Sequence, residues 1–250
     1  MDLGLQGHAV VVTGASRGLG EAATHALCAE GANVLAAARS TEALEQVASV
    51  APDQVHPVTC DMRDREAVAG LVAACVDRFG RLDAVVNNAG IAPAGKLVET
   101  DLAVMEDTVA VNVLAPAALA QAAARHWIEQ TKPGAVVNVA STSGLKGKPL
   151  LSGYSASKGA MMRLTEALSA EWARHRITVN TIAPGAFETD AQSAVTEDPA
   201  MLDARLRKIP VRRMGRPDEI GPLVCYLVSP LSSFVTGSCF VIDGGEIAKL

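Results

Sequence analysis

The stretch Thr13-Gly14-Ala15-Ser16-Arg17-Gly18-Leu19-Gly20 follows an apolar run and leads into a segment with helical periodicity. Glycines at such a strand-to-helix junction permit a tight turn and leave room for a pyrophosphate beside the backbone. The free N–H groups of the first helical turn then point at the phosphate oxygens. We therefore expect this loop to bind a dinucleotide through Gly14, Ser16, Arg17, Gly18, Leu19 and Gly20.

On both sides of this loop, short β-type runs alternate with amphipathic or Ala-rich segments along almost the whole chain. The expected strands are Ala9–Thr13, Asn33–Ala38, Gln54–Cys60, Ala84–Asn87, Ala135–Ala140, Thr178–Ile182 and Ser238–Ile242. The alternation predicts an α/β fold with a doubly wound, Rossmann-type parallel sheet of about seven strands and helices on both faces. No linker-like or repetitive segment interrupts it, so we expect a single domain over residues 1–250.

The composition excludes several classes of function. The net charge is −5 and only 3% of the residues are aromatic, which argues against a nucleic-acid partner. The five cysteines are scattered and form no CxxC pair, as expected for reduced thiols rather than a disulfide or zinc framework. We therefore expect no metal site.

Two features bear on localisation. The chain opens Met-Asp-Leu-Gly, without the basic and apolar regions of a secretory signal. The most apolar helical segment, around Ala115–Ala124, is interrupted by Pro116 and Gln121, so we expect that it does not span a membrane. We expect a cytoplasmic protein with no membrane partner.

Tyr154 and Lys158 are four residues apart in a segment that reads as one long helix, so both side chains leave the same face. An ammonium at about 4–6 Å would lower the pKa of a phenol by roughly 2–3 units. Such a tyrosine can exchange a proton with an alcohol or carbonyl at neutral pH. The alternative is a solvated pair on a helix surface. Tyr226, the other tyrosine, has Pro230 at the same offset and offers no such pair.

Two hydrolase motifs also occur in the sequence. Gly14–Gly18 matches the GxSxG elbow of α/β-hydrolases, but the last histidine, His175, precedes two further expected strands. Ser155–Lys158 matches the SxxK motif of β-lactamases, but the SDN and KTG motifs are absent. Neither hydrolase interpretation is favoured.

With the glycine-rich loop and the Tyr154/Lys158 pair together, the chain resembles the short-chain dehydrogenase/reductase family over essentially all of its length. The resemblance implies that Ser141, thirteen residues before Tyr154, holds the substrate oxygen. It also implies that Asn112 holds a water for proton relay. The implied catalytic residues are thus Asn112, Ser141, Tyr154 and Lys158, and the implied reaction is hydride transfer between a nicotinamide and a small carbonyl or secondary alcohol.

The same resemblance implies further contacts to the cofactor. Asp61 resembles the acid that contacts the adenine ring, and Asn87–Gly90 resembles a segment beside the cofactor. Pro184-Gly185 with Thr189 resembles the segment that grips the carboxamide. Phe187 stands where isoleucine or valine is more frequent, which changes the pocket wall. Outside the glycine-rich loop the expected cofactor-binding residues are Arg39, Asp61, Met62, Asn88, Ala89, Gly90, Tyr154, Lys158, Pro184, Gly185, Phe187 and Thr189.

The end of the second expected strand bears on the choice between NAD(H) and NADP(H). An acidic residue there bonds the ribose 2′-hydroxyl and repels a 2′-phosphate. Here Ala38 is followed by Arg39, whose guanidinium can bind a phosphate, and Arg17 offers a second charge. We expect NADP(H), with an NAD(H)-preferring sugar-acid or polyol dehydrogenase as the alternative. A non-catalytic dinucleotide-binding sensor is a further alternative.

Substrate and assembly are less defined by the sequence. The resemblance places a mobile lid over about residues 189–210, and the last third of the chain is most similar to gluconate 5-dehydrogenase-type members. Lys146 and Lys148 lie near the expected mouth, where they can favour an anionic substrate or simply be solvated. The helices Ser152–Arg174 and Leu102–Gln130 are long and Ala-rich, which allows close packing between subunits. The resemblance implies a homotetramer through these two helices, with a dimer as second choice.

Overall fold

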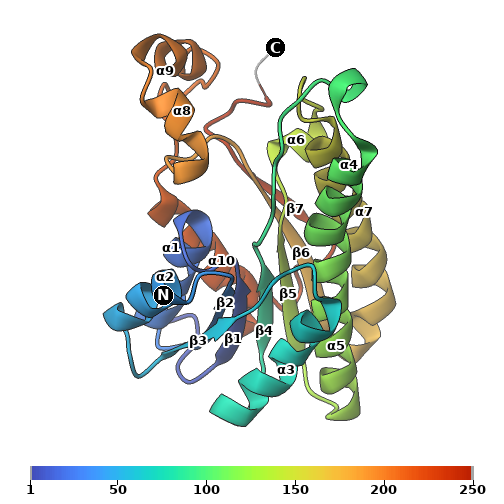
Figure 1. The fold of residues 1–250 in the computed structure, drawn as a ribbon. Helices are drawn as coiled ribbons and strands as arrows, with labels where there is room; N and C mark the ends of the chain where they lie inside the picture. Colours follow the sequence, from blue (N-terminus) through green and yellow to red (C-terminus); the bar gives the residue numbers. More distant parts are fainter. Residues whose placement is uncertain (1, 249–250) are drawn as a thin grey trace.

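The computed structural model describes residues 2–248, apart from the side chain of Ala191, and is built on a seven-stranded parallel sheet (Figure 1). The strands lie in the order β3-β2-β1-β4-β5-β6-β7. The chain therefore winds outward in one direction from β1 and then outward in the other from β4. Their bounds are β1 Ala9–Thr13, β2 Asn33–Ala38, β3 Val55–Thr59, β4 Ala84–Asn87, β5 Gly134–Val139, β6 Ile177–Pro184 and β7 Cys239–Ile242.

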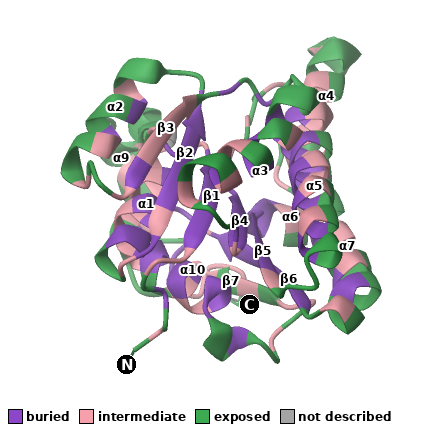
Figure 2. Ribbon diagram, turned by 90° about the horizontal axis from the view of Figure 1, so that it is seen from below, coloured by how far each residue is buried: buried purple, intermediate pink, exposed green. Residues whose placement is uncertain are grey.

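Helices cover both faces of the sheet, because successive strand residues point to opposite sides. Val10 and Val12 of β1 pack into a core with α1, α2 and α10, whereas Val11 packs into a second core with α3, α5 and α7. Figure 2 shows the inner strands β1, β2, β4, β5 and β6 as buried, whereas the edge strands β3 and β7 are partly exposed. The helices are α1 Gly18–Ala29, α2 Thr41–Val50, α3 Arg65–Phe79, α4 Leu102–Val109, α5 Ala115–Glu129, α6 Thr142–Leu145, α7 Ser152–Trp172, α8 Ser193–Thr196, α9 Pro199–Leu206 and α10 Gly221–Val228.

The predicted α/β fold is confirmed, and so is each of the seven expected strands. Their ends differ by at most two residues, the largest difference being that β6 runs on to Pro184. The reversal of strand order lies between β1 and β4, which is where ligands bind in folds of this type. The carboxyl ends of β1, β4, β5 and β6 therefore carry the candidate site.

The expected helix Leu102–Gln130 is confirmed to within one residue, and Pro116 does not interrupt it, because helix runs without a break from Leu102 to Glu129. A π-helical segment, Ala110–Leu114, joins α4 to α5, and Pro116 falls in the first turn of α5, where a missing N–H is tolerated. By length and composition alone this helix could cross a membrane, and 33% of its most apolar window is buried inside the protein. A single helix of this kind is weak support for a membrane span.

Candidate active site

The glycine-rich loop is closely packed at the carboxyl end of β1. Gly14 and Gly18 have φ of +65° and +59°, a backbone conformation that side chains disfavour. A Cβ on Gly14 would lie 2.8 Å from the Cα of Ala89, and one on Gly20 would collide with the carbonyl oxygen of Gly14. The glycines thus allow the loop to turn tightly and to lie against the end of β4.

Asn88 fastens this loop from the neighbouring strand. Its Nδ2 donates to the carbonyl oxygens of Thr13 at 2.9 Å and Gly14 at 3.1 Å. The Thr13 hydroxyl accepts from the backbone N–H groups of Asn88 and Ala89, both at 3.1 Å. The side chain of Asn88 is therefore used to hold the loop, although the residue also lines the cleft described below.

The start of α1 offers a place for an anion. Arg17 precedes the helix in an extended conformation, and no side chain caps the first turn. The N–H groups at a helix N-terminus carry partial positive charge and bind phosphate when no capping side chain satisfies them. The residues present therefore fit the pyrophosphate of a dinucleotide.

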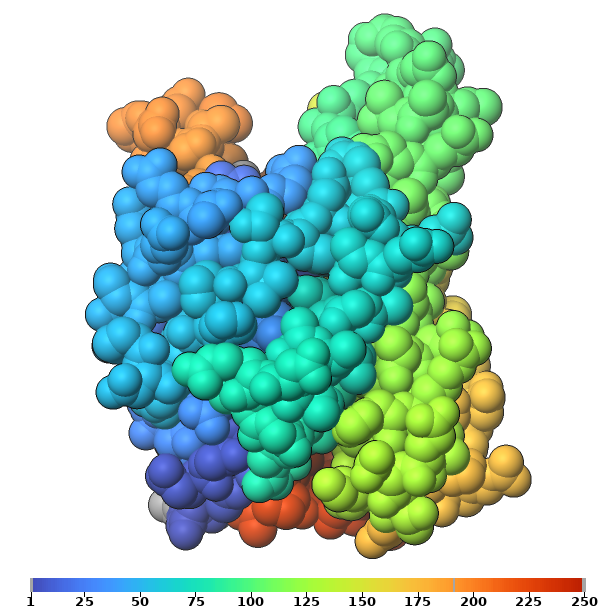
Figure 3. Space-filling model, turned by 60° about the horizontal axis from the view of Figure 1, so that its bottom comes forward, coloured from blue at the N-terminus to red at the C-terminus, as the bar shows by residue number. Residues whose placement is uncertain are grey.

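A cleft of about 1250 Å³ extends from this loop over the ends of the strands. In Figure 3 the segment of α8 and α9, in orange, and the region before α4, in green, form separate projections with a gap between them. Gly20 and Asn112 are not on the cleft wall, because Gly20 packs beneath Gly14 and Asn112 is buried. The other predicted site residues all line the cleft: Gly14, Ser16, Arg17, Gly18, Leu19, Arg39, Asp61, Met62, Asn88, Ala89, Gly90, Ser141, Tyr154, Lys158, Pro184, Gly185, Phe187 and Thr189.

Ser141 and Tyr154 come together where α6 and α7 begin. Ser141 is the N-cap of α6, and its Oγ accepts from the N–H of Ser143 at 3.1 Å. Burial raises the pKa of Tyr154, and a side-chain hydrogen bond with Ser141 only partly offsets this. The expected lowering of the Tyr154 pKa by Lys158 is therefore wrong for the protein without cofactor. At neutral pH the phenol is protonated, which is the form that can donate to a carbonyl oxygen.

Lys158 is buried beneath Tyr154 rather than solvated on a helix surface. Its Nζ donates to the carbonyl oxygen of Val139 at 2.8 Å and lies 5.8 Å from the centre of the Tyr154 ring. Burial lowers the pKa of Lys158 to about 8, because a charged ammonium loses its hydration there. The lysine is thus poised to change its charge near physiological pH.

The lowered pKa of Lys158 predicts a pH dependence of stability. The unfolded chain binds the proton more tightly, so unfolding becomes less favourable as pH rises from about 8 to 10.5. Relative to Lys158→Met, the wild-type free energy of unfolding should rise by up to about 3 kcal/mol across that window. Urea unfolding at one protein concentration measures this difference, in which the buried cysteines cancel. A difference that does not vary with pH would contradict the assignment.

Asn112 is a positioning residue behind the cleft. Its Oδ1 accepts from Ile91 N at 2.8 Å, and its Nδ2 donates to Ile91 O at 2.8 Å and to Ser157 Oγ at 3.0 Å. Ser157 in turn donates to the Tyr154 carbonyl oxygen at 2.7 Å. Since Pro116 has no N–H, the backbone carbonyl of Asn112 lacks the usual donor four residues further along the helix. The predicted water relay remains a prediction.

Two features of the cleft had no signal in the sequence. The ring of Phe187, an expected cleft residue, fills the space left by Gly215, where a Cβ would lie 2.8 Å from the ring. Arg63 forms two hydrogen bonds with Asp107, which is 44 positions further along the chain. Pairings at such separations depend on the folded topology, so no local pattern could have revealed them. Among the described residues, no cluster of His, Cys, Asp or Glu fits a metal ion.

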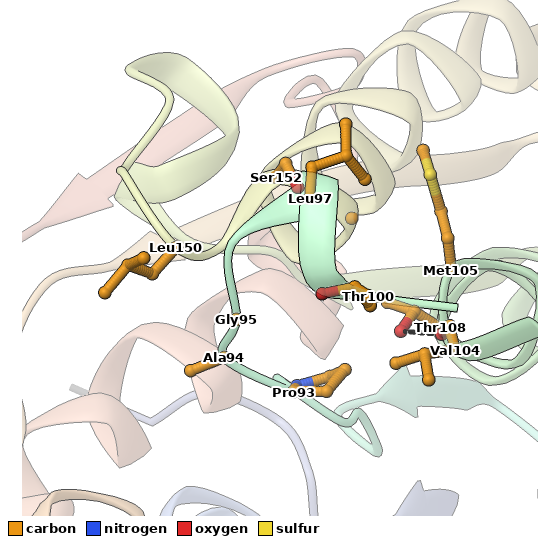
Figure 4. A pocket seen from close by; sticks show the side chains of 11 residues that line it. Pro93, Ala94, Gly95, Leu97, Thr100, Val104, Met105, Thr108, Leu150 and Ser152 are labelled. Atoms are coloured by element: carbon orange, nitrogen blue, oxygen red, sulfur yellow. Dashed lines mark hydrogen bonds between the residues drawn. The ribbon is translucent and has the colours of Figure 1, made fainter. Parts of the chain in front are cut away.

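A small cavity of about 40 Å³ lies beside the cleft, between the start of α4 and the start of α7 (Figure 4). Pro93 and Val104 line both spaces, so the two adjoin. Leu97, Met105 and Leu150 contribute to a mostly apolar wall. This side of the cleft is therefore suited to apolar groups.

A glycine-rich loop at the strand-order reversal, facing a serine, a tyrosine and a lysine, defines an NAD(P)-dependent oxidoreductase. A family model described as enoyl-(acyl carrier protein) reductase matches residues 14–246. The chain belongs to the short-chain dehydrogenase/reductase family, which confirms the expectation from its sequence motifs.

Relatives and solved structures agree with this family. The chain is 34% identical to 3-oxoacyl-[acyl-carrier-protein] reductase FabG of Thermotoga maritima, over 97% of this chain and 99% of that one. It is 33% identical to gluconate 5-dehydrogenase of Gluconobacter oxydans, over 98% and 97%. A variant of actinorhodin polyketide ketoreductase with NADPH superposes with a TM-score of 0.91, at 31% identity and 96% and 97% coverage.

Proposed function

We propose that the protein is an NADP(H)-dependent oxidoreductase that transfers hydride between a nicotinamide and a small carbonyl or secondary alcohol. The observation that carries this proposal is the convergence of Ser141, Tyr154 and Lys158 in the cleft that the glycine-rich loop bounds. The test is nicotinamide turnover, followed by absorbance, with a panel of sugar acids, polyols, diketones, acyl thioesters and steroids. Absence of turnover with every carbonyl class would contradict the proposal.

The proposed mechanism assigns one task to each side chain. A bound nicotinamide supplies or accepts the hydride. Ser141 hydrogen-bonds the substrate oxygen as negative charge develops on it, a contact that is strongest in the transition state. Tyr154 donates a proton to that oxygen in reduction and accepts one in oxidation. Lys158 returns the proton to Tyr154, and water at the Asn112 carbonyl connects Lys158 to solvent.

The preference for NADP(H) rests on the charges at the end of β2. Ala38 and Arg39 both line the cleft, and neither is an acid that would repel a 2′-phosphate. Arg17 lies within 3.8 Å of Asp190 in an exposed ion pair, so its charge is partly engaged. Arg39 is therefore the better candidate for the 2′-phosphate. The NADPH bound to the ketoreductase relative supports the same cofactor class.

The lid and the domain organisation belong to the same proposal. We propose one catalytic domain over residues 1–250, with a substrate lid over about residues 189–210 and a cytoplasmic location. Within that segment, α8 and α9 pack on each other, and Arg205 of α9 holds Glu246 by two hydrogen bonds of 2.7 and 2.8 Å. Thr189 touches the position of a Cβ on Gly18, so the lid begins at the glycine-rich loop.

A sugar-acid substrate is the second candidate, and Lys148 favours it. Its backbone N–H donates to Ser155 Oγ at 3.3 Å, which places it directly beside the start of α7. Burial is the main cause that lowers the pKa of Lys148; the charge of Glu246 opposes this shift and the charge of Arg205 adds to it. A half-buried ammonium there can receive a carboxylate. The gluconate 5-dehydrogenase relative supports including sugar acids in the panel.

We further propose a homotetramer, since much of the apolar helix Leu102–Glu129 is exposed in a single chain. Light scattering at micromolar concentration should give about four times the 25.8 kDa chain mass. Leu114→Glu, on this helix, should dissociate the assembly. Val50→Glu, at a more exposed position on α2 (67% exposed, against 42% for Leu114), should leave it intact. A wild-type monomer would refute the proposal.

A further inference from the structure

Arg63 and Asp107 form a two-pronged ion pair on the wall of the cleft. Arg63 follows the end of β3, and Asp107 lies on α4. The Arg63 Nε lies 2.7 Å from Asp107 Oδ1, and Nη2 lies 2.8 Å from Oδ2. Both residues line the cleft together with Arg39. The pair thus joins two elements at the edge where the adenosine end of a dinucleotide is expected.

The charges around Asp107 come from both sides of this part of the cleft. The hydrogen bond from Arg63 is the main cause that lowers the pKa of Asp107, and Arg39 lowers it further. The field of Arg39 therefore reaches Asp107. Without Arg63, the carboxylate would keep its charge and would face Arg39 without a competing partner.

The charge on Asp107 affects how well Arg39 can bind a phosphate ester. A free carboxylate near Arg39 would attract that guanidinium and repel a dianionic phosphate. Arg63 occupies both oxygens of Asp107 and so removes most of this effect. Asp61, whose Oδ1 is 3.4 Å from Arg63 Nη1, shares the same arginine. The result is that Arg39 remains available to a phosphate.

We propose that Arg63 is a specificity-determining residue, which acts through Asp107 to keep the Arg39 guanidinium free for the 2′-phosphate of the cofactor. This inference rests on the proposed role of Arg39. Arg63 need not touch the phosphate itself. Its contribution is to neutralise Asp107, and it should act on NADPH much more than on NADH.

The test is the ratio of the dissociation constants of NADH and NADPH, measured by fluorescence of the reduced nicotinamide without substrate. Arg63→Gln should lower this ratio by about fivefold, the size expected for an exposed charge pair. Adding Asp107→Asn to Arg63→Gln should restore the ratio to within about twofold of wild type. Asp107→Asn alone should leave the ratio unchanged or raise it. The effect of Arg63→Gln should shrink in 0.5 M salt.

Arg81→Gln is a matched control. Arg81 holds Asp83 with the same two-pronged geometry, at 2.7 and 2.8 Å, and with similar side-chain exposure to Arg63. Asp83 also accepts from the N–H of Ala9, at the start of β1 and so at the opposite end of the sheet. The control variant should therefore leave the ratio unchanged. The free energy of unfolding of Arg81→Gln measures how much stability the loss of such an ion pair removes.

Two results would overturn the inference. One is an unchanged ratio in Arg63→Gln. The other is a double variant that keeps the low ratio of Arg63→Gln, which would mean that Arg63 contacts the phosphate directly. The wild-type ratio decides the NADP(H) preference separately, because the inference concerns only how the ratio changes and whether Asp107→Asn restores it.

Discussion

Tyr154→Phe should lower turnover by at least about a hundredfold while leaving the fold and cofactor affinity close to wild type. The variant removes only the hydroxyl group, which is the proposed proton donor and the partner of Ser141. The ring stays, so its contact with the Lys158 ammonium, 5.8 Å from the ring centre, is retained. Turnover, circular dichroism and NADPH fluorescence together measure the three quantities.

Tyr226→Phe supplies the control, because Tyr226 is the second of the two tyrosines and lies on α10, away from the cleft. It should turn over at the wild-type rate. If Tyr154→Phe stays within a few-fold of wild type, Tyr154 is not the proton donor. If it loses cofactor affinity in parallel with turnover, its main role is in binding.

Replacing Ala38 by Asp and Arg39 by Leu together should reverse the cofactor preference. Losing one charge-assisted contact to a phosphate costs about 1.5–3 kcal/mol, which is at least tenfold in kcat/KM. The new carboxylate would bond the ribose 2′-hydroxyl and repel a 2′-phosphate. We expect the wild type to favour NADPH by at least about tenfold and the double variant to favour NADH.

The single variants separate the two causes. Arg39→Leu alone should weaken NADPH and leave NADH nearly unchanged, whereas Ala38→Asp should also strengthen NADH. A wild type that already works better with NADH would show that Arg39 does not bind the phosphate. The assignment to an NAD(P)-dependent oxidoreductase would stand in that case, since it depends on the fold, the family and the cleft.

Local patterns in the sequence were sufficient for the fold and for the glycine-rich loop, whereas most of the remaining cleft wall followed from the family resemblance. Strand periodicity and glycine positions depend on neighbours a few residues away, so Ala9–Thr13 and Gly14 could be placed without a structure. The four-residue spacing of Tyr154 and Lys158 fixed their common helix face. Ser141 followed from the family resemblance, and the structure brings it to Tyr154.

The properties that were missed depend on burial and long-range pairing. The spacing suggested that Lys158 would lower the pKa of Tyr154. Burial instead raises the pKa of Tyr154 and lowers that of Lys158. The pairing of Arg63 with Asp107 is invisible until β3 and α4 meet. Pro116 was expected to interrupt the apolar helix, because residue propensities do not predict the π-helical segment that precedes it.

Ser141 serves as the N-cap of α6 and as the proposed substrate contact, so a substitution at this one position affects both the stability of the fold and the rate of the reaction. An alanine there would remove the acceptor for Ser143 N–H, at a typical cost of about 1 kcal/mol, as well as the contact to the substrate. Variant libraries scored by cell growth would merge lower abundance with slower chemistry at this codon. Threonine keeps a hydroxyl for both duties, so comparing the alanine and threonine alleles at equal protein abundance separates them.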